Sequence, residues 1–179
     1  MPGRDEASDI LSEAGCSRGV TDHCLNVTRL AVLIAEGIKM NGREVDLALV
    51  EAGALLHDLG RCRTHGIRHG VVGGELAREL GLPEAVVRII VRHIGAGIPA
   101  EEASALGLPE GDYIPETLEE KIVTYADKLV EGREVVEIGV VREKFAEELG
   151  ADHPALDRLR ALHEEIRGLL GEDAYLKLF

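Results

Sequence analysis

The side chains that could carry chemistry in this sequence are histidines and aspartates. Six of them stand out by position, namely His23, His57, Asp58, His69, His93 and Asp127. Five of the six contribute an imidazole or a carboxylate where the local pattern calls for an apolar residue or a helix end. Nitrogen and oxygen ligands in one set suit iron, manganese, nickel, cobalt or zinc, and the carboxylates are also compatible with magnesium. The set therefore predicts a divalent-metal site.

Asp127 is the strongest single indication. It shares one face of a predicted helix with Val123 and Val130, in the segment TLEEKIVTYADKLVEG. A carboxylate on an apolar helix face has a large desolvation cost unless a cation or several hydrogen-bond donors receive it. A metal ion would meet that requirement, and so would a salt bridge to Arg29 or Lys128.

The metal-site interpretation of the other candidate ligands depends on their occurring together. His23 lies on the apolar face of a helix predicted over residues 20–40, and a single histidine there is more often a hydrogen-bonded core residue than a ligand. His57 and Asp58 end the apolar segment 46–58, so both side chains can turn toward one point. Together with Asp127, this order of residues favours metal binding over separate structural roles.

Positive charge that could hold a phosphate gathers near these residues. Arg61 and Arg63 follow the histidine–aspartate pair, and Arg92 and Lys128 each adjoin a candidate ligand. Guanidinium groups match phosphate oxygens in a bidentate way. We expect all four side chains to contact an anionic substrate, and Lys128 also to take part in catalysis. The alternative is that the arginines are solvated loop charges or partners of nearby glutamates.

Composition predicts the fold class. Hydrophobic residues make up 45% of the 179 residues and aromatic residues only 3%, so the core must be mainly aliphatic. Apolar residues recur at helical spacing, which predicts an all-α, single helical bundle. We expect helices over about 5–14, 20–40, 46–58, 71–80, 83–94, 117–132, 134–149 and 154–170, with loops around one short helix in 95–116. Thr117 and Glu120 should form a capping box, and Gly73 and Gly74 should allow close helix packing.

Charge and cysteine usage restrict the partners and the compartment. The net charge of −13 argues against a nucleic-acid or anionic-membrane surface, but not against a small anionic phosphate held locally. Cys16, Cys24 and Cys62 form no CxxC pair and are expected to be free thiols rather than ligands. With no signal-peptide pattern and no apolar run of about 20 residues, a cytoplasmic protein is predicted.

The ordered motifs resemble the HD-domain phosphohydrolase superfamily, in particular its HDIG subgroup. They are His23, HDLG (57–60), HGVVGG (69–74), RHIG (92–95) and YADK (125–128), and the resemblance covers residues 20–132. It implies a helical HD domain there, with an N-terminal helix in 1–19 and C-terminal helices in 133–179 packed on the same domain. The segments HGVVGGELA and EKIVTYADKL are also similar to bacterial diadenosine-tetraphosphate hydrolases, whose loop after the HD pair is longer.

The resemblance also implies a ligand set. In the family, the first histidine, the HD pair and the last aspartate hold one metal, which corresponds to His23, His57, Asp58 and Asp127. Two further histidines hold a second ion bridged by the HD aspartate, and His69 and His93 match them. The site would then hold one or two ions.

The implied activity is hydrolysis of a phosphomonoester or phosphodiester bond in a nucleotide or related small molecule. A bound metal lowers the pKa of its water toward neutrality, and His57, Asp58 and Lys128 would be the catalytic residues. The alternatives are a pyrophosphohydrolase of dinucleoside polyphosphates or nucleoside triphosphates, a non-catalytic sensor of metal and nucleotide, and an iron oxygenase. The helices after residue 133 could be core, a substrate lid or the surface of a homodimer, with core as the first expectation.

Overall fold

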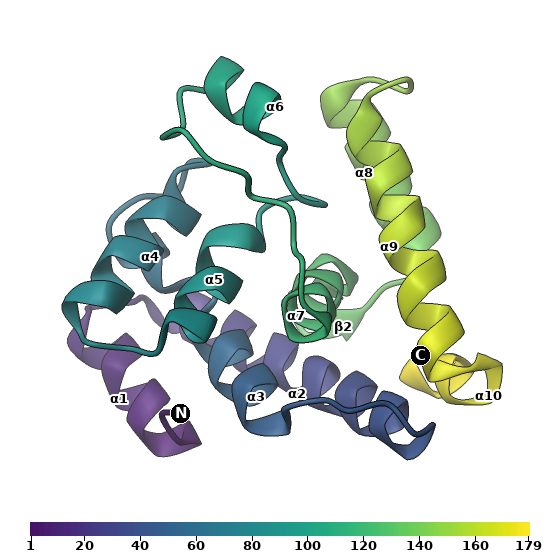
Figure 1. The fold of residues 1–179 in the computed structure, drawn as a ribbon, viewed down its shortest axis with the longest axis horizontal. Coiled ribbons are helices and arrows are strands. Elements are labelled where there is room, and N and C mark those ends of the chain that lie inside the picture. The colour runs from purple at the N-terminus through teal and green to yellow at the C-terminus, as the bar shows by residue number, and fades with distance from the viewer.

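The chain folds into helices joined by short connections (Figure 1). The structure is a computed structural model that describes residues 1–179. Its helices are α1 (Arg4–Glu13), α2 (Arg18–Met40), α3 (Leu47–Leu56), η1 (Leu59–Cys62), α4 (His69–Glu79), α5 (Glu84–Arg92), α6 (Ala100–Ala105), α7 (Leu118–Leu129), α8 (Ile138–Leu149), α9 (Pro154–Leu170), α10 (Glu172–Tyr175) and η2 (Leu176–Leu178). The all-α prediction is confirmed. No helix is both long and apolar enough to cross a membrane.

Polar residues start the central helices where the sequence predicted. The side chain of Asp46 accepts a hydrogen bond from the Leu49 amide (3.0 Å), which satisfies a free donor at the start of α3. Thr117 accepts one from the Glu120 amide (3.2 Å). Only half of the expected capping box forms, because the Glu120 carboxylate instead accepts from the Glu116 amide at 2.8 Å.

One predicted helix begins later than expected. The helix expected over 117–132 ends at Leu129, and the segment expected to be helical from residue 134 does not begin as a helix, because β1 (Val130–Glu131) and β2 (Glu134–Val135) pair as an antiparallel hairpin. Gly132 stands in the turn at φ 61°, a conformation that glycine adopts without steric cost. Helix α8 therefore starts at Ile138.

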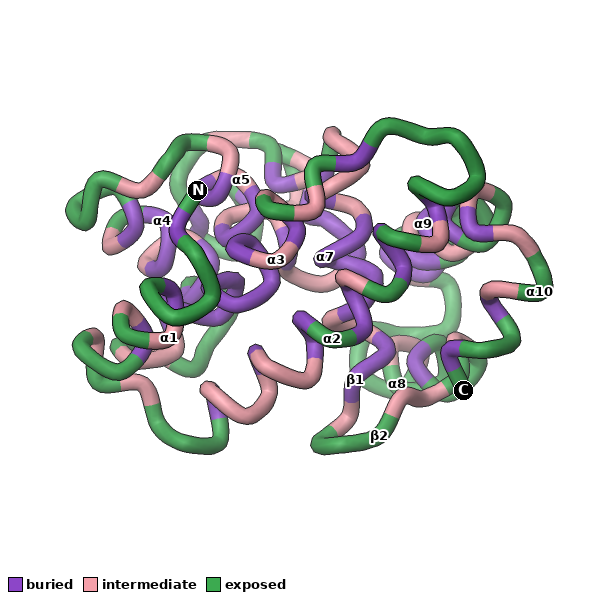
Figure 2. Tube along the Cα trace, turned by 90° about the horizontal axis from the view of Figure 1, so that it is seen from below, coloured by how far each residue is buried: buried purple, intermediate pink, exposed green.

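The core lies where α2, α3 and α7 cross (Figure 2). Helix α3 is buried over most of its length and packs against α1, α2, α5 and α7. The main apolar cluster includes Ile34 and Ile38 of α2, Tyr125 of α7 and Leu159 of α9. Because α3 runs through the middle of the bundle, the residues at its C-terminal end emerge inside the protein rather than at its surface.

Helices α8 and α9 pack on each other and reach the remainder of the fold through α7 and α2 (Figure 1). Leu162, Ile166 and Leu170 of α9 join the main core cluster. In Figure 1 this pair stands opposite α4 and α5, and α6 lies near the top, above α5.

Candidate metal centre

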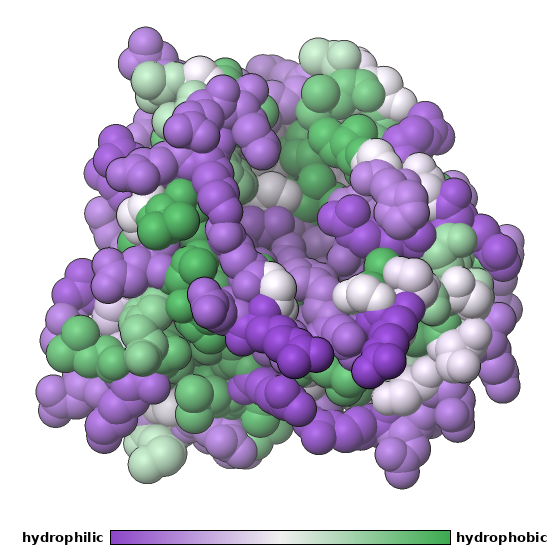
Figure 3. All heavy atoms as spheres, turned by 180° about the vertical axis from the view of Figure 1, so that it is seen from behind, coloured by the Kyte–Doolittle hydropathy of each residue, from purple (hydrophilic) through white to green (hydrophobic).

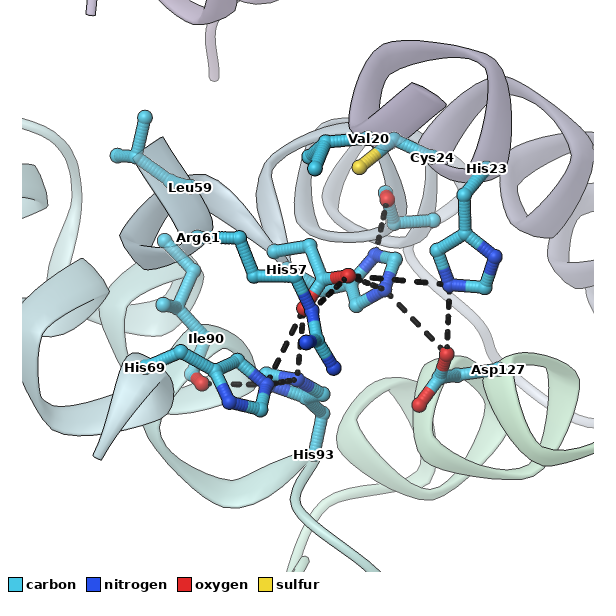
Figure 4. A network of polar contacts seen from close by, with 12 residues as sticks. Val20, His23, Cys24, His57, Leu59, Arg61, His69, Ile90, His93 and Asp127 are labelled. Atoms are coloured by element: carbon cyan, nitrogen blue, oxygen red, sulfur yellow. Dashed lines mark hydrogen bonds and ion pairs between the residues drawn. The ribbon is translucent and has the colours of Figure 1, made fainter. Parts of the chain in front are cut away.

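The six predicted ligands come together from five segments of the chain (Figure 4). His23 projects from α2, His57 and Asp58 follow α3, His69 begins α4, His93 follows α5, and Asp127 lies in α7. At Asp58 the backbone leaves the helical conformation (φ −97°, ψ 16°). The buried helix thus ends at the pair, and the two side chains enter the same space.

Asp58 lies at the centre of the cluster, and its two oxygens face different histidines. Oδ2 lies 3.9 Å from His23 Nε2 and 3.7 Å from His57 Nε2. Oδ1 lies 3.2 Å from His69 Nε2 and 3.5 Å from His93 Nε2. The carboxylate thus stands between two pairs of imidazoles.

Asp127 closes the cluster on the side of α7. Its Oδ1 lies 2.9 Å from His23 Nε2 and 3.4 Å from His57 Nε2. Its Oδ2 lies 2.7 Å from Lys128 Nζ, so the salt bridge weighed from the sequence is present as well. One oxygen therefore belongs to the histidine cluster, and the other holds a lysine beside it.

Three of the histidines are oriented by the backbone. Each places Nδ1 within hydrogen-bond distance of the carbonyl three residues earlier, in the pairs His57–Ala54 (2.7 Å), His69–Gly66 (2.9 Å) and His93–Ile90 (2.7 Å). A carbonyl only accepts, so Nδ1 carries a hydrogen, and Nε2 is the nitrogen that faces the cluster. His69 Nε2 and His93 Nε2 nevertheless approach to 3.0 Å, an arrangement that requires a proton or a cation between them.

The donor set fits a divalent metal. His57 Nε2 and Asp58 Oδ1 are buried and have no hydrogen-bond partner within the protein, which is unfavourable unless a cation receives them. Ligand atoms in each of three groups lie within 4.8 Å of one another, and the groups are His23–His57–Asp58, His57–His93–Asp127 and Asp58–His69–His93. Imidazole nitrogens with carboxylate oxygens suit borderline transition metals.

Local charges keep the carboxylates ionised. Burial alone would raise the pKa of Asp127, but Lys128 and the adjacent histidines lower it well below its ordinary value. Burial likewise raises the pKa of Asp58, but His57, His69 and His93 together hold it far below its ordinary value. Burial lowers the pKa of His93 to about 4. At His57 burial also lowers the pKa, but Asp58, Cys24 and Asp127 together outweigh it, so the pKa of His57 is raised.

Close backbone packing brings His69 to Asp58. A Cβ atom at Gly60 would overlap the carbonyl oxygen of His69, so η1 and the start of α4 can meet only with glycine there. A Cβ at Gly73 would lie 2.8 Å from Cγ2 of Ile90, which confirms the close packing expected of this glycine. The motif glycines therefore shape the site through close backbone packing.

The predicted phosphate contacts divide into two groups. Arg61 donates from Nε to Asp58 Oδ2 at 2.7 Å, and both Arg61 and Lys128 line a cavity beside the cluster. Arg63 is exposed, and Arg92 forms ion pairs with Glu116 and Glu120. These two arginines therefore match the alternative interpretation, in which they are a solvated loop charge and a partner of nearby glutamates. Neither lines this cavity. The three cysteines are free thiols, and Cys24 is buried.

The cavity has a volume of about 470 Å³ and opens beside His69, His93 and Asp127. Figure 3 shows the molecule from behind, with a hollow in its upper half bordered in part by hydrophobic side chains. The far wall comes from α8 and α9, including Phe145 and Arg158. Sequence reasoning did not assign these residues to the site, and the scarcity of aromatic residues was the only sequence feature that set Phe145 apart.

The family model that matches this chain is the HD domain, over residues 20–132. The chain belongs to the HD-domain family. Residues 20–132 are also the range over which the motifs resembled that family, and the resemblance is confirmed.

Several relatives of this HD-domain protein are known. It is 55% identical over 166 residues to an uncharacterized protein of Methanocaldococcus jannaschii, covering 93% of this chain and 98% of that one. It is 40% identical to a tRNA (cytidine(56)-2'-O)-methyltransferase of Thermoplasma volcanium, but the match spans only 49% of that protein against 97% of this chain. It is 30% identical to ribonuclease Y of Cutibacterium acnes, over 88% of this chain and 30% of that one.

Solved structures support the same fold. The HD domain of the L. monocytogenes phosphodiesterase PgpH, in complex with cyclic-di-AMP, matches with a TM-score of 0.55 at 17% identity, covering 92% of this chain and 98% of that one. The same domain in a second structure matches with a TM-score of 0.53. At this identity, the match establishes the shared helical fold.

Proposed function

We propose that this HD-domain protein is a metal-dependent phosphohydrolase that cleaves a phosphomonoester or phosphodiester bond in a nucleotide or related small molecule. The observation that carries the proposal is the position of Asp58. Its two oxygens face two separate pairs of histidines, and one of these pairs, His69 and His93, lines the adjacent cavity. Asp58 would hold metal together with His23 and His57 on one side and with His69 and His93 on the other.

The chain's own residues would prepare the site before substrate arrives. When bound, a divalent metal supplies an activated water and an electrophile for a phosphoryl oxygen. The hydrogen bonds from Nδ1 of His57, His69 and His93 hold the imidazoles with Nε2 facing the centre. Because backbone carbonyls already fix the three imidazole rings, metal binding would require little rearrangement of these side chains.

Two cations would receive the phosphate. Lys128 Nζ is held at the cavity wall by Asp127. Arg61 uses Nε for Asp58, and its terminal nitrogens have no hydrogen-bond partner in the protein, so they are free to bind phosphoryl oxygens. We propose both as substrate-binding residues, with Lys128 also stabilising charge in the transition state.

The names of similar proteins suggest two substrate classes. The PgpH domain was solved with a cyclic dinucleotide, whereas ribonuclease Y is named for RNA. The cavity volume lies in the range of about 300–1,000 Å³ usual for small-molecule sites. The net charge of −13 disfavours a long polyanion. We therefore propose a small nucleotide, with RNA as the second candidate.

The test is hydrolysis by metal-loaded protein. Manganese, iron, nickel or cobalt would be added to chelator-treated protein, and phosphate or alcohol release measured from p-nitrophenyl phosphate, bis(p-nitrophenyl) phosphate, nucleotides and a short RNA. Asp127→Asn should lose activity. Glu120→Gln serves as the control, because this buried carboxylate pairs with Arg88 and Arg92 away from the cavity.

Each result has a definite meaning. Metal-dependent hydrolysis that is lost in Asp127→Asn and kept in Glu120→Gln supports the proposal. Preference for the RNA over every small nucleotide would favour the second candidate. If the protein binds metal and nucleotide without turnover, it is a sensor rather than an enzyme. If it cleaves only pyrophosphate bonds, its substrate is a polyphosphate rather than a phosphate ester.

A further inference from the structure

The cavity beside the metal centre has two chemically different ends. One end carries the ligands His69, His93 and Asp127 together with the cations Arg61 and Lys128. The other end extends between the α5–α6 connection, α6 and α8, where the walls are mainly aliphatic or aromatic. A phosphate would occupy the first end, so the second end is available to the organic part of the substrate.

Three exposed apolar side chains line the cavity. Ile67, Leu106 and Leu149 are exposed by 37%, 50% and 46%, and all three line this cavity. They come from the loop before α4, the end of α6 and the end of α8. Single exposed apolar residues are ordinary, but three from separate segments around one cavity indicate a binding surface.

Phe145 provides the one phenyl ring in these walls. It lies on α8, is half-buried, and is one of only two phenylalanines in the chain. A ring at the edge of a cavity offers a flat face on which a planar group can stack. The family match ends at residue 132, so α8 lies beyond the segment shared with HD domains in general.

The one arginine at this end of the cavity is already paired. The Arg158 guanidinium contacts both oxygens of Glu102, at 2.9 and 2.6 Å, and also donates to the Gly97 carbonyl at 3.1 Å. His153 uses Nδ1 to accept the Ala155 amide at the start of α9. Glu148 adds a negative charge. This end therefore has no unpaired lysine or arginine for a second phosphate.

We infer that α8 determines substrate specificity, with Phe145 and Leu149 binding the nucleoside of a substrate that carries its single phosphate at the metal centre. The inference rests on the proposed function, because that function places the phosphate beside Lys128. It adds that the base is recognised by stacking and apolar contact rather than by charge. Triphosphates should be poor substrates, because their extra phosphates would have no cation to meet.

The direct test uses nucleosides, which carry the base but have no phosphate to hydrolyse. Binding of adenosine, guanosine, cytidine and uridine to the full-length, metal-loaded protein would be measured by calorimetry. Phe145→Ala should weaken binding of the preferred nucleoside by roughly tenfold, and Phe145→Tyr should preserve it. Leu149→Ala is a second variant whose exposed side chain can be removed with little effect on folding.

Val140→Ala is the matched control on the same helix. Val140 is 41% exposed and does not line the cavity, so its loss should leave nucleoside binding unchanged. The inference is overturned if no nucleoside binds, or if Phe145→Ala and Leu149→Ala, each with its melting temperature retained, bind as the wild type does. If Phe145→Ala unfolds, nucleoside binding by Leu149→Ala alone decides whether the inference stands.

Kinetics separates this inference from the proposed function. For a nucleoside monophosphate, Phe145→Ala should raise KM by roughly tenfold, while kcat/KM for methyl phosphate stays unchanged because that ester has no base. Equal or better kcat/KM for a triphosphate than for its monophosphate would overturn the single-phosphate argument. Nucleoside binding that depends on Phe145, without hydrolysis of any ester, would contradict the proposed function and leave the nucleoside site standing.

Discussion

Replacing Asp58 by asparagine is the sharpest test of the metal centre, because this one carboxylate faces all four neighbouring histidines. At a metal concentration of 100 times Kd, binding to the native state stabilises it by about 2.7 kcal/mol. For a domain of this size, each kcal/mol raises the melting temperature by about 2–4 °C. Metal should therefore raise the melting temperature of the wild type by about 5–10 °C, and that of Asp58→Asn by almost nothing.

The metal-free proteins supply the baseline. Asp58 accepts a charged hydrogen bond from Arg61, and loss of such a bond costs about 1.5–3 kcal/mol. Asp58→Asn should therefore melt lower than the wild type even without metal. The quantity to compare is the change in melting temperature on adding manganese to each protein, since that difference removes the effect of the baseline.

Glu120→Gln provides the matched comparison. Glu120 is also a buried carboxylate, only 2% exposed, and it pairs with Arg88 and Arg92 rather than with the histidines. Its variant should also melt lower, yet keep the full rise on adding metal. A full metal-dependent rise in Asp58→Asn, measured by differential scanning calorimetry, would refute the role assigned to Asp58.

Three further changes test other parts of the site. The double change His69→Ala with His93→Ala should reduce the metal content by about one ion per chain while the ion near His23 and Asp127 remains, as measured by mass spectrometry; unchanged metal content would remove these two histidines from the ligand set. In metal-free protein, burial holds His93 neutral down to a pKa of about 4, against 6.5 in the unfolded chain, so the unfolded state binds the extra proton in this range. The free energy of unfolding should therefore fall by about 3 kcal/mol as the pH is lowered from 6.5 to 4. In His93→Gln, measured by urea titration, this pH dependence should be weaker; an unchanged pH dependence would mean that other groups cause it. Gly60→Ala should lower the unfolding free energy by about 3 kcal/mol, because η1 must move away from the His69 carbonyl, and a urea midpoint equal to that of the wild type would contradict this packing.

Local features of the sequence were sufficient to predict most helices and the types of ligand. The spacing of apolar residues and the caps at Asp46 and Thr117 act within a few neighbouring residues, so they can be recognised without knowing the fold. The hairpin before α8 was missed because strands of two residues leave almost no periodicity to detect. Its turn depends on a single residue, Gly132.

The candidate ligands could be proposed from sequence because their residue types conflict with their surroundings. Asp127 on an apolar face and His57 with Asp58 at the end of a buried helix both need a polar partner, wherever the chain folds. The functions of Arg63 and Arg92 could not be judged in the same way. A long charged side chain is compatible with solvent, a glutamate or a phosphate, and only the packing of α5 against α7 gives Arg92 its partners Glu116 and Glu120.

By itself, the sequence determined that the protein would be helical, that it resembles the HD domain, and which side chains could bind a metal. The tertiary structure alone decided that Asp58 stands between two pairs of histidines, since those distances join four separate segments of the chain. It also decided that α8 and α9 form the far wall of the cavity. The physical reason is that periodicity reports which face of a helix is buried, whereas the neighbour that covers this face is chosen by packing of the whole chain.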